Sequence, residues 1–498
     1  MTMCRLFLLP LLLSVSTIHA AAPKETSDGW YRQGENTLQQ MLGHKSLTGK
    51  ARNVILFLGD GMGVTTVTAA RILAGQIQGG YGEEHLLEFE RFPNLALIKT
   101  YTTNQQVPDS AGTMSAIMTG VKTLDGVLSV DQDIVRGDCA SAQGQARETL
   151  LEQFEQAGRA TGIISTARIT HATPAATYAH LPERDWESDA DLPAAAAKAG
   201  CVDIARQLTE FRHGDGIDVV FGGGRAAFFP TTAPDPEYPG EHGLRRDGRD
   251  LIKEWQQRHP DGRYLWNGAD FAALDPQKTT RVLGLFQPSH MQFNADRERD
   301  PGKEPALADM TATAIRILNR NPKGYFLMVE GGRIDHALHG TNAWRALTDT
   351  MAFSDAVAKA VELTQPEDTL IIVTADHSHV LTLAGYPTRG NPILGKVVEN
   401  DAAGRPQSAP SPADDGKPYT TLGFANGPGV VMPRRDLNGT DTTAPDFRQD
   451  ALVPLESETH GGEDVAAYAR GPWAQLVRGV QEQNYLYHVM RHAAHLPE

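Results

Sequence analysis

The sequence predicts an α/β fold: a large, mostly parallel sheet with helices on both faces. Two observations carry this prediction. Apolar runs of strand length end at polar residues or glycines, and amphipathic helical patterns alternate with them along the chain. Strands without a polar face are typical of parallel sheets covered on both sides. The 498 residues exceed the usual size of a single core, so the chain forms either one large domain with insertions or two domains.

Five apolar runs are the expected strands, and a helix is expected between the last two. The strands are "NVILFLGDG" from Asn53, "TGIIST" from Thr161, "IDVVFGGG" from Ile217, "GYFLMVEGG" from Gly324 and "DTLIIVTADHS" from Asp368. The helix follows Asn342, where apolar residues and one serine recur at helical spacing on one face: Leu347, Met351, Ser354, Val357 and Val361.

Two segments interrupt this alternation. Residues 228–270 are rich in Pro, Gly, Asp and Trp and predict a long surface excursion. Residues 386–428, with "GRPQSAPSPADDGKP", predict an inserted loop-rich subdomain resembling a lid or crown. We expect residues 23–498 to form one domain that carries this insertion.

The N-terminus predicts export. Arg5 precedes the apolar run "LFLLPLLLSV", and small residues follow in "HAAAP", which indicates a signal peptide over residues 1–20 with cleavage at 20–22. The run is too short for a membrane span, and the polar end "RHAAHLPE" resembles no lipid-anchor signal. We therefore expect a secreted protein without a membrane anchor, most simply periplasmic. The net charge of −15 argues against nucleic acid as a partner.

Polar residues follow the expected strands, where parallel folds gather ligands. Asp60 ends the first strand, Glu330 lies at the end of the fourth, and Asp376 and His377 end the fifth. "RIDHALH" adds Asp335 and His339, which share one helix face, and "ETHGGED" adds His460. Taken singly, these residues also fit helix starts, tight turns or solvated loops. Together they supply oxygen and nitrogen ligands without thiolate, a set that suits zinc where histidine is present and magnesium where only oxygen is offered.

Ser110 in "VPDSAGTMSAIMTG" has two readings, a helix cap or a nucleophile. Two metal ions ~4 Å apart can stabilise the attacking and leaving oxygens of an in-line phosphoryl displacement, and a neighbouring metal favours the ionised form of a serine. A Ser-His-Asp triad is the rival mechanism, but "PDSAG" lacks the G-x-S-x-G elbow.

Six separated motifs resemble the alkaline phosphatase family, in that family's order, from about residue 50 to 495. They are "NVILFLGDGMG", "VPDSAGT", "HATPAATYAHLPERDW", "VEGGRIDHALH", "TADHSHV" and "ETHGGEDVAAYARGP". Phrases such as "PDPEYP" and "GVQEQNYLYHVM" are similar to its animal-type branch. The resemblance implies a single catalytic domain that hydrolyses phosphate monoesters through a phosphoserine.

The resemblance also implies a role for each site residue. Ser110 would be the nucleophile, and Arg184 would bind two phosphate oxygens. Two zinc ions and one magnesium ion would be bound. Asp335, His339 and His460 would form the first zinc site, and Asp376, His377 and Ser110 the second. Asp60 would bridge the second zinc and the magnesium ion. Thr173 and Glu330 would complete the magnesium site, and His171 would lie just outside it.

Further expectations concern cysteines, calcium and assembly. After removal of a signal peptide, Cys139 and Cys201 remain, and in an oxidising compartment they form one disulfide rather than two free thiols; the resemblance supports this. It also implies a homodimer. A calcium site of the animal branch would map to Glu237, the Phe286 carbonyl, Gln287 and Asp300, but Gln287 replaces a carboxylate, which puts calcium binding in doubt.

Two alternatives remain open at this stage. One is a phosphodiesterase or phosphonate hydrolase of the same superfamily, which Arg184 disfavours because its two-pronged guanidinium suits two unsubstituted phosphate oxygens. The other is a non-catalytic periplasmic scavenger of phosphate or metal, which needs the acidic and histidine ligands but neither Ser110 nor Arg184.

Overall fold

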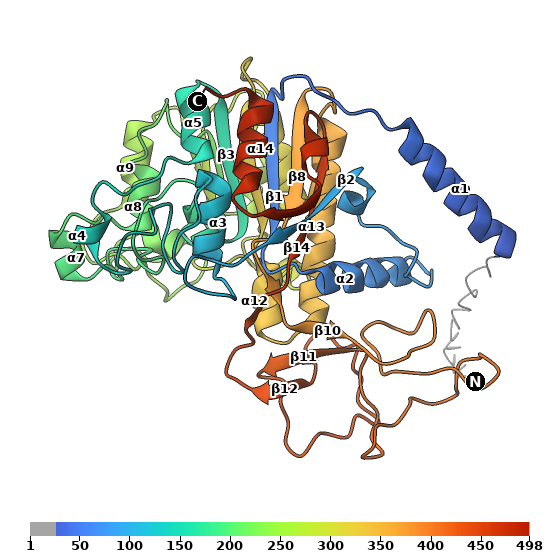
Figure 1. Cartoon of the computed structure of the whole chain (residues 1–498). Coiled ribbons are helices and arrows are strands. Elements are labelled where there is room, and N and C mark those ends of the chain that lie inside the picture. The colour runs from blue at the N-terminus through green and yellow to red at the C-terminus, as the bar shows by residue number, and fades with distance from the viewer. Residues whose placement is uncertain (1–25, 498) are drawn as a thin grey trace, which may run out of the picture.

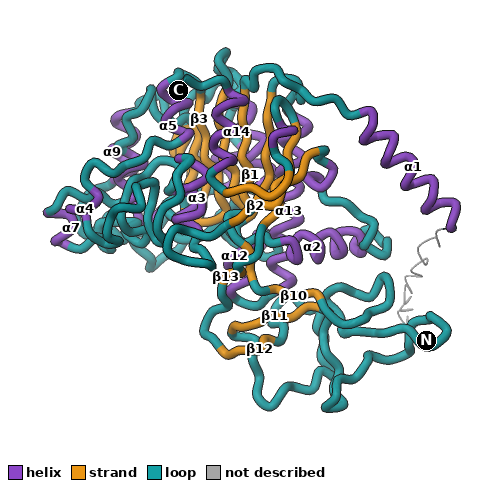
Figure 2. Tube along the Cα trace, in the orientation of Figure 1, coloured by secondary structure: helices purple, strands orange, loops and turns teal. Residues whose placement is uncertain are grey.

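The computed structural model describes residues 26–497 and contains a ten-stranded sheet at its centre (Figures 1 and 2). The strand order is β15-β2-β14-β8-β1-β7-β3-β4-β6-β5. The strands are β1 (Asn53–Gly59), β2 (Asn94–Lys99), β3 (Ala160–Arg168), β4 (Val219–Gly223), β5 (Arg263–Leu265), β6 (Val282–Leu285), β7 (Tyr325–Gly331), β8 (Thr369–Thr374), β14 (Val465–Arg470) and β15 (Gly479–Glu482).

The five expected strands are confirmed as the contiguous centre of this sheet, β8-β1-β7-β3-β4, and all pair in parallel. Val54 to Leu58 of β1 have no exposed surface, as expected for a strand covered on both faces. Only β14 runs antiparallel to its neighbours β2 and β8. The expectation of a mostly parallel α/β sheet is therefore confirmed.

Helices cover both faces of the sheet. On one face, α13 (Ala343–Leu363) packs against α2 (Val64–Ile77) and α11 (Leu307–Leu318), and on the other α14 (Tyr485–Ala494) packs against α3 (Ser110–Thr119). The helix expected after Asn342 is confirmed, and the Asn342 side chain caps it. The remaining helices are α1 (Ser27–Gly43), α4 (Cys139–Ala142), α5 (Leu150–Gln156), α6 (Ala172–Ala175), α7 (Ala194–Lys198), α8 (Ile204–Thr209), α9 (Leu251–Arg258), α10 (Gly268–Ala272) and α12 (Arg333–His339).

The prediction of a surface excursion over residues 228–270 is wrong in part. This segment contributes α9 and β5, the outermost strand of the central sheet, and Arg245 within it is fully buried. The cause is local: β5 has only three residues, and Arg245 is buried because Asp203 and Asp247 accept hydrogen bonds from its guanidinium. Neither the short strand nor the burial of this arginine can be predicted from hydropathy.

A second, three-stranded sheet lies below the central one in Figure 1. It consists of β10 (Leu381–Leu383), β11 (Leu422–Gly427) and β12 (Ala451–Pro454), and long loops that include residues 386–421 surround it. The last two strands, β9 (Ser378–His379) and β13 (His460–Gly461), form an antiparallel pair. This pair holds His460, the first residue of β13, beside the chain that follows β8.

Two further features concern the ends of the described chain. Helix α1 has no buried residue and projects from the central part of the molecule (Figure 1), with Arg389 over the ring of its Trp30 at 5.3 Å. None of the helices within residues 26–497 is long and apolar enough to cross a membrane. The expected signal peptide, residues 1–20, and its cleavage site lie outside the described residues.

Candidate metal centre

The strand order places the expected acidic residues at one edge of the sheet. β1 lies between β7 and β8, and their registers pair Leu58 with both Glu330 and Thr374. Asp60 and Asp376 each lie two residues beyond that level, at the carboxyl ends of their strands. The structure therefore brings Asp60, Glu330 and Asp376 together, as the sequence predicted.

Ser110 is the first residue of α3 and does not cap that helix. The cap is Asp109, whose side chain accepts hydrogen bonds from the backbone N–H groups of Ala111 and Gly112. The Ser110 hydroxyl is 2% exposed and lies 3.1 Å from His377 Nε2. Its position at the positive end of a buried helix favours a bound anion.

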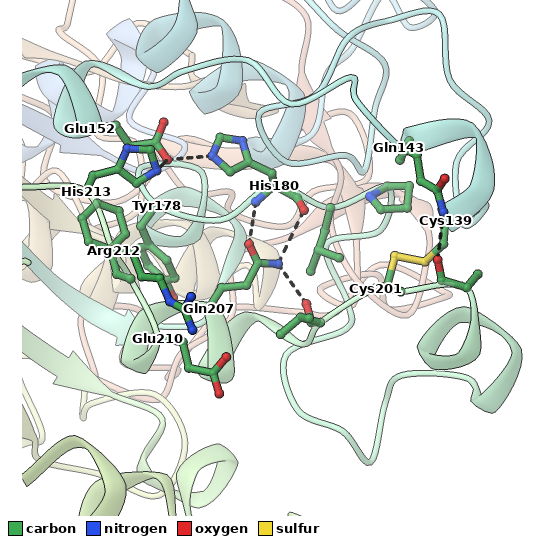
Figure 3. A pocket seen from close by; sticks show the side chains of 17 residues that line it. Cys139, Gln143, Glu152, Tyr178, His180, Cys201, Gln207, Glu210, Arg212 and His213 are labelled. Atoms are coloured by element: carbon green, nitrogen blue, oxygen red, sulfur yellow. Dashed lines mark hydrogen bonds and ion pairs between the residues drawn. A yellow bond between two sulfur atoms is a disulfide. The ribbon is translucent and has the colours of Figure 1, made fainter. Parts of the chain in front are cut away.

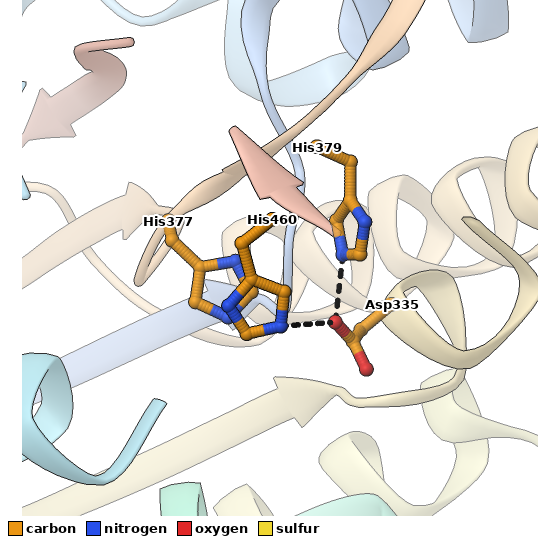
Figure 4. A group of neighbouring side chains, drawn as sticks. All are labelled: Asp335, His377, His379 and His460. Atoms are coloured by element: carbon orange, nitrogen blue, oxygen red, sulfur yellow. Dashed lines mark hydrogen bonds and ion pairs between the residues drawn. The ribbon is translucent and has the colours of Figure 1, made fainter. Parts of the chain in front are cut away.

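Asp335, His339 and His460 form a triangle of ligand atoms. His339 Nε2 lies 3.2 Å from His460 Nε2 and 3.3 Å from Asp335 Oδ1. The third side, His460 Nε2 to Asp335 Oδ1, is 3.5 Å and is drawn in Figure 4. Tetrahedral zinc with bonds of ~2.0–2.1 Å needs ligand atoms about 3.3 Å apart. The triangle therefore has the size of a tetrahedral zinc site.

Backbone carbonyls fix which nitrogen of each histidine is free. His460 Nδ1 lies 2.7 Å from the Pro108 carbonyl oxygen and His339 Nδ1 lies 2.5 Å from that of Glu458. A carbonyl only accepts, so both Nδ1 atoms carry the proton and donate, and both Nε2 atoms present lone pairs to each other. A cation between them removes this repulsion.

A second group surrounds His377, which is fully buried. Its Nδ1 donates to the Ser378 carbonyl oxygen, so its Nε2 is again the free nitrogen. Around this atom lie Ser110 Oγ at 3.1 Å, Asp376 Oδ2 at 3.3 Å and Asp60 Oδ1 at 3.5 Å. The spacing again matches the edges of a tetrahedral site.

A third group extends from Asp60 toward Glu330, His171 and Thr173. Asp60, Glu330 and His171 each offer a ligand atom within 4.8 Å of the others. Several polar atoms in this region are buried and lack any hydrogen-bond partner: both carboxylate oxygens of Asp60, Glu330 Oε1, Asp376 Oδ2, Thr173 Oγ1 and His171 Nδ1. Buried polar atoms nearly always have partners, so this concentration points to bound ions.

The electrostatics lead to the same conclusion. Burial raises the pKa of Asp60 well above 3.8, and the charges of Asp376, Asp335 and Glu330 raise it further. Burial raises the pKa of Glu330 to about 7 and lowers that of His377 to about 3. Buried carboxyl groups in mutual repulsion, next to neutral imidazoles, require positive charge to ionise. The described site therefore has the character of a divalent metal centre.

Arg184 contacts two residues beside the metal centre, Asp109 and His171. Its Nη1 donates to Asp109 Oδ2 at 3.0 Å, and its Nη2 lies 3.1 Å from His171 Nε2. Burial and the nearby Arg184 charge hold the pKa of His171 well below 6.5, so its ring is neutral and Nε2 accepts from Arg184. Asp109 links Arg184 to the helix that begins with Ser110.

Two residues of the centre escaped the sequence analysis, His379 and Glu458. Nε2 of His379 donates to Asp335 Oδ1 at 2.7 Å (Figure 4), and its Nδ1 donates to Glu458 Oε2 at 2.5 Å. Both nitrogens donate to carboxylates. Burial alone would lower the pKa of His379, but these two carboxylates raise it to about 10. His379 therefore orients Asp335. The available signal was its position two residues after His377, in a strand-like segment.

A large cavity elsewhere contains none of the expected site residues except the cysteines. It measures about 490 Å³ and lies beside the disulfide between Cys139 and Cys201, which confirms the expected bond (Figure 3). Glu152 at its floor accepts a hydrogen bond from His180 at 2.8 Å, and Gln207 bonds to the backbone of His180 and Val202. These polar groups have partners, unlike those at the strand ends.

Comparisons with known proteins agree with this geometry. The family model for alkaline phosphatase matches residues 51–496. The tissue-nonspecific alkaline phosphatase of Gallus gallus is 45% identical over 500 residues, covering 98% of this chain and 93% of that protein. The alkaline phosphatase of Gadus morhua is 45% identical over 474 residues, covering 93% and 96%.

Solved structures show the same fold. The alkaline phosphatase of Thermus thermophilus superposes with a TM-score of 0.64 at 24% identity, covering 92% of this chain and 94% of that one. The chain therefore belongs to the alkaline phosphatase family, the hydrolases of phosphate monoesters that its motifs indicate.

Proposed function

We propose that this enzyme hydrolyses phosphate monoesters by transferring the phosphoryl group to Ser110 and then to water. The observation that carries the proposal is the position of the Ser110 hydroxyl, 3.1 Å from the free nitrogen of His377 and beside buried carboxylate oxygens without donors. A serine used only for structure would not need such surroundings, because Asp109 already caps its helix.

The donor atoms fit two zinc ions and one magnesium ion. Asp335, His339 and His460 would hold one zinc, and His377, Asp376, Asp60 and Ser110 the other. The unpartnered oxygens of Asp60, Glu330 and Thr173 would hold magnesium, a hard cation that prefers oxygen. When bound, these ions supply Lewis acidity and neutralise the charge that develops on the phosphoryl group.

The chain's own residues perform two displacements. The Ser110 hydroxyl gives up its proton to solvent, its oxygen forms a bond to phosphorus, and the bond between phosphorus and the alcohol oxygen breaks, so that this oxygen leaves with the electron pair and takes a proton from solvent. Water then loses a proton and attacks the phosphoserine from the vacated side, the bond from phosphorus to Ser110 Oγ breaks, Ser110 Oγ regains a proton, and inorganic phosphate leaves. The N-terminus of α3 faces the negative charge in both steps.

Arg184 would select the monoester. Asp109 and His171 orient its guanidinium from two sides, so that it presents paired N–H donors in a fixed plane. Two unsubstituted phosphate oxygens can accept from such a fork, whereas a diester has a substituent on one of them.

We also propose secretion to the periplasm and a homodimer. Secretion rests on the expected signal peptide and on the disulfide, which favours an oxidising compartment. The homodimer is supported by apolar side chains on α1 that are largely exposed, among them Tyr31 (70%) and Leu42 (70%). Mass measurement by light scattering tests it, and a monomeric mass contradicts it.

Hydrolysis of p-nitrophenyl phosphate and bis-p-nitrophenyl phosphate tests the activity and the role of Arg184. We expect fast turnover of the monoester and negligible turnover of the diester by the protein loaded with zinc and magnesium. Arg184→Lys should lower kcat/KM for the monoester about 10- to 100-fold, because one bidentate contact to a charged group is lost. Arg206→Lys, a change in a surface ion pair with Glu210, is the matched control and should have no effect.

Other outcomes select the alternatives. A preference for the diester would identify a phosphodiesterase with the same metal centre. Binding of phosphate without turnover of either substrate, in protein fully loaded with zinc, would identify a scavenger and contradict the role of Ser110.

A further inference from the structure

A second group of buried acidic residues lies at the carboxyl ends of β4 and β6, outside the centre that holds Ser110. Glu237 and Asp235 follow β4, Gln287 follows β6, and Asp300 follows the short 3-10 helix Arg297–Arg299. Asp235, Gln287 and Asp300 are all buried, and the Glu237 side chain is 1% exposed. Three of them, Glu237, Gln287 and Asp300, are with the Phe286 carbonyl the positions at which the family resemblance implies calcium.

The acidic oxygens in this group have donors. Glu237 Oε2 accepts from Arg225 Nη2 at 2.6 Å, and its Oε1 accepts from the backbone N–H of Gly302 at 2.7 Å. Asp300 Oδ2 accepts from the backbone N–H of Glu304 at 2.8 Å, and its Oδ1 accepts from Gln287 Nε2 and from the Tyr238 hydroxyl.

Gln287 supplies the contact that decides the character of the site. An Asp300 carboxylate can only accept, so the neighbouring amide must turn its NH₂ group toward it. The single proton of the Tyr238 hydroxyl, which lies 3.1 Å from the Gln287 oxygen and 3.3 Å from Asp300 Oδ1, is shared between these two acceptors. The side chain at this position therefore presents a donor to Asp300, where a calcium ligand would have to present an oxygen to the ion.

A side-chain cation already contacts two of these carboxylates. Arg225, fully buried, donates two hydrogen bonds to Asp235 and one to Glu237. The residues present do not fit calcium.

We infer that the Gln287 amide replaces a calcium ion in this chain: its N–H donates to Asp300 and, with Arg225 on Glu237, holds the group closed without metal. The fold around β4 and β6 is then independent of calcium. A single change, Gln287→Glu, removes the donor, adds a negative charge and supplies the missing oxygen ligand. It should therefore create a calcium site from residues already in place.

Calcium binding tests this without relying on activity. The full chain, loaded with zinc and magnesium and freed of calcium, is dialysed against calcium up to about 10 mM, above the ~1 mM dissociation constants of weak extracellular calcium modules. We expect the parent to show no calcium-dependent rise in Tm. Gln287→Glu should bind one more calcium ion per chain than the parent, with at least a tenfold gain in affinity and a saturable rise in Tm.

Two controls separate this site from the metal centre. Asp300→Asn combined with Gln287→Glu should abolish the additional calcium ion, and Gln287→Met, which gives neither donor nor charged ligand, should not gain one. A parent protein that binds calcium and loses it on Gln287→Met would overturn the inference, because the Gln287 oxygen would then be a ligand. It would also be overturned if Gln287→Glu folded but bound no additional ion.

Discussion

At the ends of β1, β7 and β8, Asp60 holds two buried oxygens without any donor, and Glu330 and Asp376 hold one each. At the ends of β4 and β6, every oxygen of Glu237 and Asp300 accepts a hydrogen bond from Arg225, Gln287, Tyr238 or the backbone. Both groups are buried, acidic and adjacent to strand ends.

The difference shows that acidic composition does not identify a metal site. Free lone pairs that converge from several residues do, because a buried oxygen without a donor loses solvation that only a cation or a proton restores. The predictions below test this distinction, starting with the largest effect.

The strongest test of the metal centre at the ends of β1, β7 and β8 is Ser110→Ala. Turnover of p-nitrophenyl phosphate should fall more than about a thousandfold, as for loss of other catalytic nucleophiles, and mass spectrometry after acid quench should find no phosphoserine. Zinc content should stay close to that of the parent, because the nitrogen and carboxylate ligands remain. Ser115→Ala, on the same helix, is the matched control: its hydroxyl bonds only to the backbone of Val127 and Ser129, so activity should be retained. Full turnover by Ser110→Ala would remove the nucleophile from the account.

A smaller effect is expected at Glu458, which contacts residues of the metal centre but is not one of its expected ligands. Its carboxylate accepts from His379 and from the Val380 N–H at 2.7 Å, and its backbone oxygen accepts from His339. Glu458→Gln removes the charge that keeps His379 protonated, so Asp335 loses its orienting donor. Zinc affinity should fall about 10- to 100-fold, the usual cost of changing such a partner.

Competition with a chromophoric chelator measures this affinity. Glu456→Gln, two residues earlier and exposed, should leave it unchanged. Equal affinities in both variants would show that Glu458 plays no positioning role.

The smallest effect is expected at Glu155. This residue has a buried oxygen without a hydrogen-bond donor, but it belongs to none of the groups of metal ligands described above. Glu155 Oε2 has no partner, and burial, with the charges of Asp218 and Asp215, raises the pKa of Glu155 to about 8. The folded state therefore keeps the proton that the unfolded chain releases near pH 4.5, and stability falls as pH rises from there to about 8.

Glu155→Gln should remove this loss, stabilising the protein by on the order of 1–3 kcal/mol at pH 9 and by little at pH 5. Thermal unfolding at both pH values measures the difference, with Glu148→Gln, at an exposed position, as control. If Glu155→Gln destabilised the protein more at pH 9 than at pH 5, the sign of the proposed titration would be wrong.

The central sheet could be predicted from the sequence because its middle strands are apolar on both faces. The outer strands could not. β2 has alternating exposed residues such as Leu95 and Leu97, β14 is built largely of alanine, and β5 has three residues, so none has a distinctive hydropathy. Their pairing depends on long-range contacts that local patterns do not encode.

The metal centre was predictable to the extent that its residues end strands or belong to quoted motifs. His379 and Glu458 were missed because each contacts only another side chain of the centre or the backbone, and their residue types have no fixed spacing to the ligands. The hydrogen bonds that satisfy Glu237 and Asp300 could not be predicted either, because they depend on the orientation of the Gln287 amide and on the contact of Arg225 with Glu237.

Anomalous diffraction from crystals grown with zinc, magnesium and calcium tests the central distinction most directly. Data collected on both sides of the zinc edge should show two zinc peaks, one among Asp335, His339 and His460 and one among Asp60, Asp376 and His377. Long-wavelength data should show no calcium peak between Glu237 and Asp300. A calcium peak there, or strand ends without zinc, would contradict the account that converging, unpartnered buried oxygens mark the metal sites of this protein.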